Sequence, residues 1–487
     1  MRPMKLGYLL AASGLAALLA ASPLACSSET IIRQAPAADG AIPGDDAGPG
    51  TIEEAGPECT PGAVLPCTCA KGDKGQATCS ADAKNGQCQC VTTPLDKHKV
   101  ISTTGKAAIE AETHLAAAPD GSLCSAWISI LPGGTSEIGY VFSRDGGATW
   151  TAPLDIGDPV GRESSDPVVA SDAQGNFYVT WIAFRRTGGG GGGGGAADFV
   201  LYVAKAPAGQ NKFNAPVSVD TFPSGDKPWI TVTAAGTILV TVMERPAGTS
   251  ILYAHRSTNG GATWSRTEIF KSAAGSQANF VVPCAPKTGA RVWATHLTTE
   301  GASGFGQRLH WSDDDGVTWP AASSKLFADG SSIGPATCAA KGSDVWVGYG
   351  QWTAQPADQE APVDEYHVMH TSNGVMLTDV VASDSATKQQ LLGALALEDA
   401  TGELALAYYA GDAEGATGNV RSVRSKDGGK TWGKSTAVTA PLTFTADRGS
   451  PKWLGDYIGT VLRGGALYTT YGENALQFTH VAFSKTP

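Results

Sequence analysis

The sequence is poor in charged residues, and after residue 21 it lacks any long apolar run. Charged residues make up 17% of the 487 residues, and acidic groups outnumber basic ones to give a net charge of −11. Nucleic-acid binding is therefore excluded as a main function, because phosphates repel such a surface. A membrane-spanning helix is excluded beyond the first apolar run, Leu9–Ala21, since no later stretch is long enough. Long helical patterns are also missing, which leaves an all-β chain.

Glycine is abundant, with 61 residues, and one eight-residue pattern recurs. The pattern Ser-x-Asp-x-Gly-x-Thr-Trp, with Asn for Asp in one copy, begins at Ser143, Ser257, Ser312 and Ser425. Its Asp or Asn is suited to accept hydrogen bonds from the backbone just ahead, and its Gly suits a positive φ. The Trp is expected to cover the turn while its N–H finds a partner. Each copy should therefore hold a β-hairpin, which is a structural role.

With these residues the sequence resembles the Asp-box, or BNR, repeat of the sialidase-like β-propellers. The clear copies lie 114, 55 and 113 residues apart. The two long intervals each contain a degenerate copy, one at 204–207 and one at 371–374, and a further unit begins at 476–485. Each of the resulting seven units opens with a hairpin around a glycine turn, at Gly121, Gly175, Gly236, Gly289, Gly342, Gly402 and Gly464/Gly465.

This repetition predicts an all-β propeller of four-stranded blades, spanning residues 97–487. Seven blades are favoured over six, the number that the sialidase resemblance implies. The seventh unit lacks its fourth strand. The segment Lys99–Thr103, ahead of the first blade, is expected to supply that strand and close the ring.

The N-terminal part is divided into three segments. Residues 1–25 have the pattern of a secretion signal, with Arg2 and Lys5 before the apolar run. Cys26 follows a stretch that resembles a bacterial lipobox, although Pro23 stands where Leu is usual. Residues 26–57 are interpreted as this lipid-anchor cysteine and a disordered linker. The chain is therefore expected to be an outer-membrane or cell-surface lipoprotein attached only through its lipid; simple cleavage and secretion is the alternative.

Residues 58–92 form a cysteine-rich module with almost no apolar core. In an exported chain this predicts disulfides among its six cysteines rather than zinc, since the spacing is Cys-x-Cys and no His lies inside. These cysteines are Cys59, Cys67, Cys69, Cys79, Cys88 and Cys90. Cys284 and Cys338 occupy equivalent places in neighbouring blades and are expected to form a bridge. Cys124 is expected to be a buried thiol.

In propellers, binding sites usually lie on the face opposite the Asp-box turns, where each inner strand begins. Eight to ten residues before the glycine turns, four blades carry the acids Glu112, Asp166, Asp226 and Asp456. These blades are contiguous in a closed ring, so the acids should form an arc at the channel mouth. The alternative interpretation is that the acids only cap turns at strand starts.

An acidic arc suggests an oxygen-ligand cation, with calcium at Asp166, Asp226 and Asp456, although no cofactor is required. Exposed aromatic rings beside carboxylates would suit a sugar. The predicted binding residues are Glu112, His114, Asp166, Asp226, Trp229, Trp453, Asp456 and Tyr457.

The sialidase resemblance also implies catalytic groups: an Arg-Ile-Pro motif, three arginines that grip a carboxylate, a Tyr–Glu pair and an Asp acid/base. No Arg-Ile-Pro occurs, and the acids at the inner-strand starts would repel the substrate carboxylate. If the chain is a hydrolase, its catalytic residues would come from Arg162, Arg245, Arg448, Tyr457, Glu473, Asp166 and Asp226.

The favoured function is a binding module for a glycan or an extracellular protein. The alternative is an exo-sialidase or another glycoside hydrolase, because a fold does not determine function. A third interpretation is a scaffold whose cysteine-rich module does the binding.

Overall fold

The computed structural model divides the chain into two compact units, one containing Asp96–Pro487 and the other Leu18–Leu95. In the larger unit it describes residues 98–102, 107–187, 195–246, 248–301, 304–331, 334–354, 363–384, 388–411, 417–439, 442–443, 453–474 and 479–487. In the smaller unit it describes only three strands. Within the described residues no helix is long and apolar enough to cross a membrane.

The smaller unit contains an antiparallel sheet of β1 (Val64–Thr68), β2 (Lys74–Thr78) and β3 (Cys88–Gln89). The side chains of the six clustered cysteines lie outside the described part of the chain. The predicted signal segment, Cys26 and the linker lie outside it as well. The bridges, the lipid anchor and the segment boundaries therefore stay predictions.

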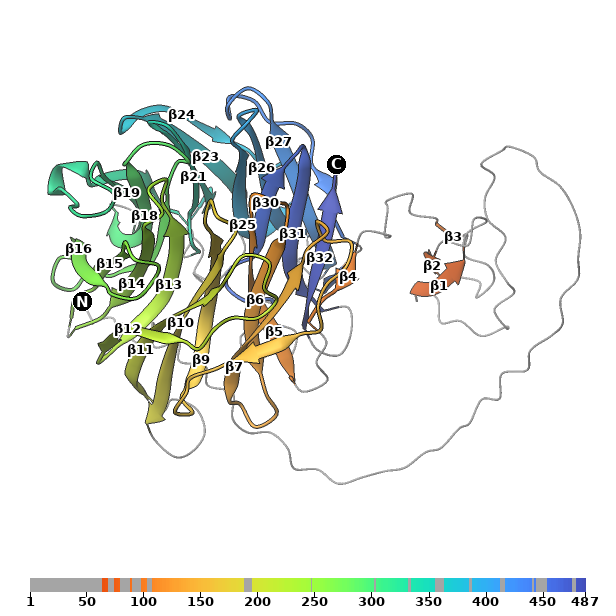
Figure 1. Ribbon diagram of the computed structural model, residues 1–487. Coiled ribbons are helices and arrows are strands. Elements are labelled where there is room, and N and C mark those ends of the chain that lie inside the picture. The colour runs from red at the N-terminus through yellow and green to blue at the C-terminus, as the bar shows by residue number, and fades with distance from the viewer. Residues whose placement is uncertain are drawn as a thin grey trace, which may run out of the picture. The chain divides into compact units, whose positions relative to one another are not determined.

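The larger unit is a ring of seven antiparallel sheets, six of them built from consecutive strands and the seventh completed by β4 (Figure 1). Blade one comprises β5 (Ile109–Ala117), β6 (Leu123–Ile130), β7 (Ser136–Ser143) and β8 (Leu154–Ile156). Blade two comprises β9 (Glu163–Ser171), β10 (Phe177–Thr187), β11 (Gly195–Ala206) and β12 (Val217–Phe222). Blade three comprises β13 (Gly225–Val232), β14 (Ile238–Glu244), β15 (Ile251–Ser257) and β16 (Ser265–Lys271). Blade four comprises β17 (Ala278–Cys284), β18 (Val292–Gly301), β19 (Gly304–Ser312) and β20 (Lys325–Asp329).

The remaining blades continue the same order. Blade five comprises β21 (Thr337–Lys341), β22 (Asp344–Gln351), β23 (Glu365–Ser372) and β24 (Val375–Val381). Blade six comprises β25 (Lys388–Glu398), β26 (Glu403–Gly411), β27 (Thr417–Ser425) and β28 (Thr436–Ala437), with β29 (Leu442–Thr443) also paired to β27. Blade seven comprises β30 (Gly459–Arg463), β31 (Ala466–Glu473), β32 (His480–Thr486) and β4 (Lys99–Val100). The preference for seven blades is confirmed, and six is wrong.

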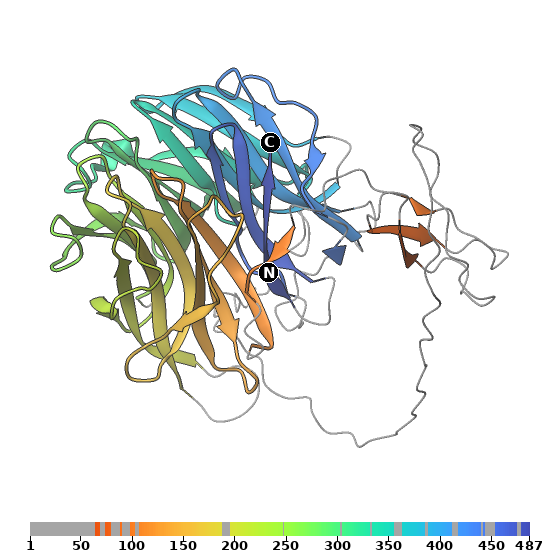
Figure 2. The same ribbon diagram turned by 45° about the vertical axis from the view of Figure 1, so that its right-hand side comes forward.

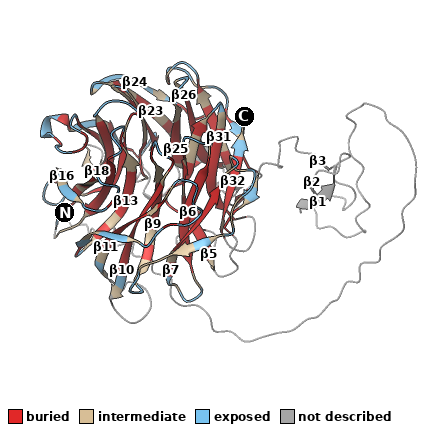
Figure 3. Cartoon of the chain, viewed as in Figure 1, coloured by how far each residue is buried: buried red, intermediate tan, exposed pale blue. Residues whose placement is uncertain are grey.

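Burial explains the strand order within a blade. All eight residues of β6, with the sequence LCSAWISI, are buried, whereas β16, with the sequence SRTEIFK, is mostly exposed. Figure 3 shows the same gradient, with buried residues in the inner strands and exposed ones at the outer edges. The core lies between blades: Phe142 of blade one packs edge-on against Phe177 of blade two at 5.7 Å between ring centroids. This stacking buries both faces of each inner sheet.

The ring closes through β4, as predicted. In blade seven, Val100 pairs with Ala482 and Lys99 with Phe483, and the Ile101 N–H donates to the Val481 carbonyl at 2.9 Å. Figures 1 and 2 both show β4 beside β32. The last blade is therefore completed by the strand that precedes the first.

The recurrent turn connects the third and fourth strands of four blades and has the predicted geometry. In the first copy the Thr149 N–H donates to Asp145 Oδ1 at 2.8 Å, and the Gly147 N–H donates to Ser143 Oγ at 2.8 Å. The same two bonds are present in the other three copies. The expectation for the Trp is correct only for Trp264, which donates to the Gly261 carbonyl at 3.1 Å. Within the described residues the buried indole N–H has no partner in the other copies, at Trp150, Trp319 and Trp432.

The predicted disulfide between neighbouring blades is present. Cys284 in β17 is bonded to Cys338 in β21, with their Cα atoms 5.9 Å apart. Cys124 is a buried free thiol, as expected, and burial raises its pKa well above the usual value.

Candidate functional site

Five inner strands contain a bulge at the same place near their start. The residue at each bulge has a left-handed backbone, and these residues are Glu112 (φ 53°), Asp166 (φ 58°), Lys227 (φ 49°), Phe280 (φ 51°) and Leu392 (φ 50°). Pairing of each strand with its neighbour shifts register there. A non-glycine residue in this conformation costs about 1–2 kcal/mol, and such bulges re-aim side chains beside sites. In four of these blades the bulge residues, Glu112, Asp166, Lys227 and Phe280, lie together at the channel mouth.

Three carboxylates meet one ammonium at this mouth. Lys227 Nζ lies 3.0 Å from Glu112 Oε1, 2.5 Å from Asp166 Oδ1 and 2.7 Å from Asp456 Oδ2. We call these four residues the Lys227 cluster; all are buried, and they come from blades three, one, two and seven. The backbone at Gly455 packs directly against the backbone of Glu112. Only glycine fits there, because a Cβ at residue 455 would lie 2.4 Å from the Glu112 nitrogen. The cluster therefore ties four blades together.

Each charge in the cluster depends on the others. Burial disfavours the ammonium of Lys227, but Asp166, Asp456 and Glu112 outweigh it and raise its pKa well above the usual value. Burial also raises the pKa of Glu112 well above its usual value, against the opposing effect of Lys227. Buried charges persist only when paired in this way. Burial thus favours the protonated form of Glu112.

Asp226, the fourth predicted acid, lies beside the cluster and has different partners. Asn279 Nδ2 donates to Asp226 Oδ2 at 3.3 Å. Burial raises the pKa of Asp226 to about 6, while Lys227 and Arg245 oppose the rise. The predicted arc of four equivalent acids is thus corrected: at blade three the bulge holds Lys227, nine residues before Gly236, and Asp226 precedes it.

The aromatic residues at the mouth are buried, so the expectation of exposed rings is wrong. Trp229 is 5% exposed, Tyr457 2% and Trp453 8%. The rings of Trp229 and Tyr457 lie 5.2 Å apart, and His114 meets both edge-on at 5.4 and 6.5 Å. Tyr457 donates its hydroxyl to the Pro167 carbonyl at 3.0 Å. These rings form packed contacts between blades one, three and seven.

The predicted catalytic arginines contact different carboxylates. Arg162 pairs with Asp158 at 3.1 Å and with Asp198 at 2.9 Å. Arg245 lies near Asp226, and burial lowers its pKa against the effect of that carboxylate. Arg448 lies outside the described residues. The structure therefore does not bring Arg162 and Arg245 to one shared anion.

Tyr457 and Glu473 do not form the Tyr–Glu pair of the hydrolase hypothesis. The carboxylates that act on Tyr457 are those of Glu112, Asp166, Asp456 and Asp226, and with burial they raise its pKa well above the usual value. Glu473 instead lies near Tyr409, Tyr471 and His98. The hydroxyl of Tyr457 is thus held in its protonated form.

One buried network near the ring closure was not predicted from sequence. His480 Nδ1 lies 3.0 Å from Glu110 Oε2, and Ser102 Oγ donates to the same oxygen at 2.5 Å. The bond to Glu110 raises the pKa of His480. The three residues come from opposite ends of the chain, so no local spacing marks them. The contact between these residues becomes predictable only when the pairing of β4 with β32 is known.

In the described part of the chain, no group of three or more His, Cys, Asp or Glu residues is placed to hold a metal ion. Calcium at Asp166, Asp226 and Asp456 stays a prediction that this geometry does not favour. The Lys227 ammonium already binds the carboxylates of Asp166 and Asp456.

No protein-family model matches the chain, and no curated protein matches it. Among solved structures, one from Dyadobacter fermentans, described as a protein of unknown function, is 14% identical with a TM-score of 0.48 over 80% of this chain and 97% of that one. A sialidase described as Hadza microbial is also 14% identical, with a TM-score of 0.48 over 88% and 74%. A Trypanosoma rangeli sialidase is 12% identical, with a TM-score of 0.43 over 88% and 58%. Likenesses this distant do not identify a function or a family.

Proposed function

We propose that this propeller is an extracellular binding module without glycosidase activity, and that its ligand is a protein. The observation that carries this proposal is the Lys227 cluster. Of the carboxylates expected to serve a hydrolase, Asp166 is buried and ion-paired to Lys227 Nζ, which also holds Glu112 and Asp456 within 3.0 Å. Asp226 is half-buried and accepts a hydrogen bond from Asn279, and Glu473 lies apart from both, near Tyr409 and Tyr471. A glycosidase needs one carboxyl group that donates a proton and another group that attacks or activates water. With Asp166 neutralised by an internal ammonium and Glu473 placed among other residues, these carboxyl groups do not offer that pair.

Tyr457 supports the same proposal. Its hydroxyl donates to the Pro167 carbonyl, and the surrounding carboxylates raise its pKa. A nucleophilic tyrosine requires the opposite effect, a base that removes its proton.

A protein ligand is favoured over a glycan because the sugar-stacking rings are buried. Trp229, Trp453 and Tyr457 are each less than 9% exposed. The exposed described groups on this face include an ion pair between Arg185 and Asp198, whose side chains are 53% and 47% exposed. Such paired charges suit the polar rim of a protein interface more than the hydroxyls of a sugar.

A turnover assay tests the non-catalytic part. The chain from residue 26 onward, with Cys26→Ser to prevent lipidation, would be incubated with a fluorogenic sialoside and a set of nitrophenyl glycosides. Each substrate would be tested with calcium and with chelator. We expect the same background for this protein and for its Tyr457→Phe and Asp226→Asn variants. Turnover that either substitution abolishes would make the protein a glycoside hydrolase and overturn the proposal.

A capture assay tests the ligand class. The same protein would be applied to a glycan array and to a biotinylated panel of extracellular proteins from its own culture. We expect saturable protein capture that Arg185→Glu weakens at least tenfold and that Lys271→Glu, an exposed control on β16, leaves unchanged. Binding confined to glycans would replace the protein ligand with a sugar.

Export and tethering through Cys26 are part of the proposal and rest on sequence. The basic residues, the apolar run and Cys26 lie in the order of a lipoprotein leader. Membrane fractionation tests this: Cys26→Ala should move the exported chain from the membrane fraction to the medium or periplasm. Retention of the variant in the membrane would contradict it.

A further inference from the structure

The central channel contains a cavity of about 370 Å³ on the side of the ring away from the Lys227 cluster. Inner strands of all seven blades line it, with the parts that lead to the glycine turns. Small-molecule sites have volumes from about 300 Å³ upward and are mostly apolar with a few polar groups. The size of the cavity and its contribution from every blade make it a candidate site on the face opposite the predicted mouth.

Aromatic rings lie at the inner end of the cavity. Trp229 and His114 line it, and Tyr457 packs against both rings. Beyond these rings Lys227 Nζ lies 5.9 Å from the Tyr457 ring and 5.6 Å from the Phe280 ring. These rings, which we call the floor of the cavity, therefore lie between it and the Lys227 cluster.

The outer end is marked by charged residues of both signs. Lys287, Glu398, Asp399 and Arg463 belong to the lining. Arg463 donates to the Ala118 and Pro119 carbonyls. A rim that carries both signs does not select a cation or an anion, which leaves uncharged molecules as the suited class.

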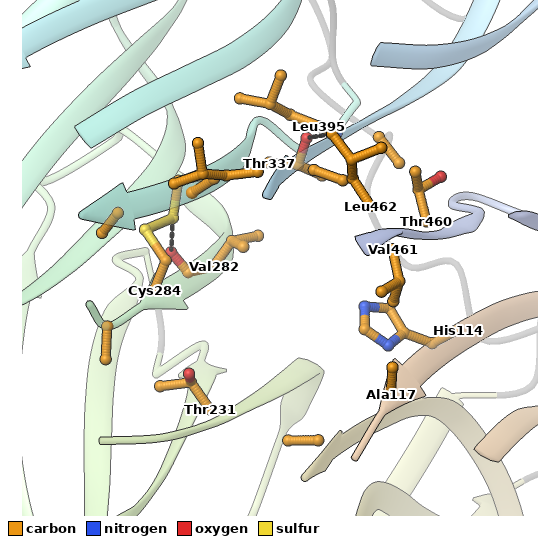
Figure 4. Close-up of a pocket in the computed structure, with 18 of the residues that line it drawn as sticks. His114, Ala117, Thr231, Val282, Cys284, Thr337, Leu395, Thr460, Val461 and Leu462 are labelled. Carbon is orange, nitrogen blue, oxygen red and sulfur yellow. Dashed lines mark hydrogen bonds between the residues drawn. A yellow bond between two sulfur atoms is a disulfide. The ribbon is translucent and has the colours of Figure 1, made fainter. Parts of the chain in front are cut away.

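The walls combine apolar side chains with polar groups, among them His114, Thr231, Thr337 and Thr460. Figure 4 shows Val282, Leu395, Val461 and Leu462 around the space, with the His114 imidazole and the Thr231 side chain directed into it from different walls. Burial lowers the pKa of His114 to about 4, so the ring is neutral at pH 7. A neutral imidazole has one hydrogen-bond donor and one acceptor. The ring also makes a hydrogen bond to the backbone of Val169, which leaves its other nitrogen to accept a hydrogen bond from a ligand hydroxyl.

We propose that this channel pocket binds a small, uncharged, mainly apolar molecule that carries a hydroxyl group, with His114 as its hydrogen-bond partner. The apolar body lies against the inner-strand walls, and the hydroxyl reaches the imidazole at the floor. This proposal uses the face opposite the proposed protein-binding mouth and does not depend on it.

Two matched aromatic probes test the pocket. 2-Naphthol has the proposed hydroxyl, and 2-methoxynaphthalene has the same ring system without a donor. Binding of each to the mature chain with Cys26→Ser would be measured by calorimetry and equilibrium dialysis. We expect one 2-naphthol per chain and at least tenfold weaker binding of 2-methoxynaphthalene, the ratio that one net hydrogen bond supplies.

Three variants separate the pocket from general surface binding. His114→Phe keeps the ring and removes the hydrogen bond, so it should abolish the tenfold preference. Thr231→Trp fills the cavity and should weaken both probes at least tenfold. Thr378→Trp, on the outer strand β24, is the control and should bind both probes as the parent does, with all melting temperatures recorded to confirm folding.

Three outcomes would overturn the proposal. They are no saturable binding of 2-naphthol below millimolar concentration, a preference for 2-naphthol that survives His114→Phe, or unchanged binding in Thr231→Trp. Because no catalytic or protein-capture readout is involved, these outcomes leave the test of the mouth unaffected.

Discussion

At the scale of single residues, Lys227 replaces the cation that the acidic spacing suggested. Its ammonium lies among carboxylates from three other blades. Isolated buried charges of either sign are strongly unfavourable, and their pairing offsets that cost without adding large stability. We therefore interpret the cluster as a structural ion-pair network that connects four blades, in which removing one charge destabilises the others.

Replacing Lys227 tests this dependence. Lys227→Met keeps the length of the side chain and leaves three buried carboxyl groups without their partner. We expect the free energy of unfolding to fall by about 3–5 kcal/mol, the usual result of breaking a buried ion pair. Denaturant unfolding followed by tryptophan fluorescence measures it, with the exposed Lys271→Met as control. A decrease of less than about 1 kcal/mol in the free energy of unfolding, as surface substitutions give, would show that the cluster does not stabilise the contacts between blades.

Asp226 predicts a specific dependence on pH. Its pKa is about 6 in the folded chain against an ordinary value of 3.8, because burial disfavours the carboxylate. A raised pKa favours folding below about pH 4, and this contribution is lost as the pH rises through 6. Asp226→Asn should therefore gain stability relative to the parent between pH 4 and pH 7, by roughly 2–3 kcal/mol. Denaturant unfolding at pH 4 and at pH 7 measures the difference in stability between variant and parent, with the exposed Asp313→Asn as reference. A variant that becomes less stable relative to the parent as the pH rises would contradict the raised pKa of Asp226.

Sequence spacing located most of the Lys227 cluster but misassigned one position. Glu112 and Asp166 both stand nine residues before their glycine turns, and Lys227 does as well. The charge pattern of the other blades favours Asp226 at the equivalent position of blade three, although Asp226 stands ten residues before Gly236 and Lys227 stands nine. The positive φ at Lys227 decides between them, and backbone conformation at a bulge is not encoded by charge. Burial of the mouth was also missed, since it depends on side chains from four blades.

At the scale of elements, the recurrent turn acts through its serine as well as its acid. Ser312 Oγ accepts the Gly316 N–H at 2.9 Å and donates to Asp314 Oδ1 at 2.7 Å. The residue types and their spacing were sufficient to predict these turns. They were not sufficient to predict the surroundings of the Trp rings, because a Trp ring can pack against a residue from another blade. The Trp150 ring in blade one, for example, lies 5.0 Å from the Phe483 ring in blade seven, measured between ring centroids.

Removing that serine hydroxyl measures the contribution of one turn. Ser312→Ala leaves the Gly316 N–H and the Asp314 carboxylate without this partner, so we expect a loss of about 1–2 kcal/mol. Ser265→Ala, at an exposed serine with only a long 3.5 Å bond, is the matched control. Equal stability of the two variants in denaturant would show that the turn is held by its backbone alone.

The outer strand β24 differs from the other blade edges. Val375, Met376, Leu377 and Val381 are 64, 49, 54 and 40% exposed on one seven-residue strand. By contrast, β16 carries three charged residues and β28 has only two residues. β24 carries one charged residue, Asp379, which follows the exposed run Val375–Leu377. Apolar edges favour pairing between chains where no charge interrupts them, so we expect that run to be the part of β24 that pairs.

A lysine at this edge should therefore reduce aggregation. We expect Leu377→Lys to raise the protein concentration at which light scattering begins, with little change in unfolding free energy because the side chain is already exposed. Val317→Lys, at a single exposed valine 47% accessible in a turn, is the control. Equal scattering onset in both variants and the parent would remove β24 as the aggregation site.

At the scale of the whole molecule, repeat spacing predicted the blade count and the ring closure. Seven glycine turns and a seventh unit lacking its fourth strand were sufficient, because a propeller must pair its last blade with its first. Which face carries a cavity was not predictable from the same spacing. That depends on which inner side chains are small, and alternation along a strand does not show which blades meet at the axis.

Closure through β4 predicts that a few residues control the stability of the entire ring. Ile101 is 5% exposed, its N–H donates to the Val481 carbonyl, and Ser102 Oγ accepts the Val481 N–H at 2.8 Å. A chain that begins at residue 107 loses these contacts, whereas one that begins at residue 97 keeps them. We expect the shorter chain to lose roughly 3 kcal/mol or more of unfolding free energy, from the buried isoleucine and the hydrogen bonds.

Ile101→Asp in the longer chain separates closure from truncation, because it opposes burial without removing residues. It should shift the denaturation midpoint in the same direction as the shorter chain. Each blade of the closed ring packs on two neighbours. Opening the ring between blades one and seven would expose one face of each, and unfolding should begin at these two blades. If both variants instead unfold at the same denaturant concentration as the parent, closure would rest on blades one and seven packing face to face through the Lys227 cluster, and Lys227→Met would then be the more damaging change.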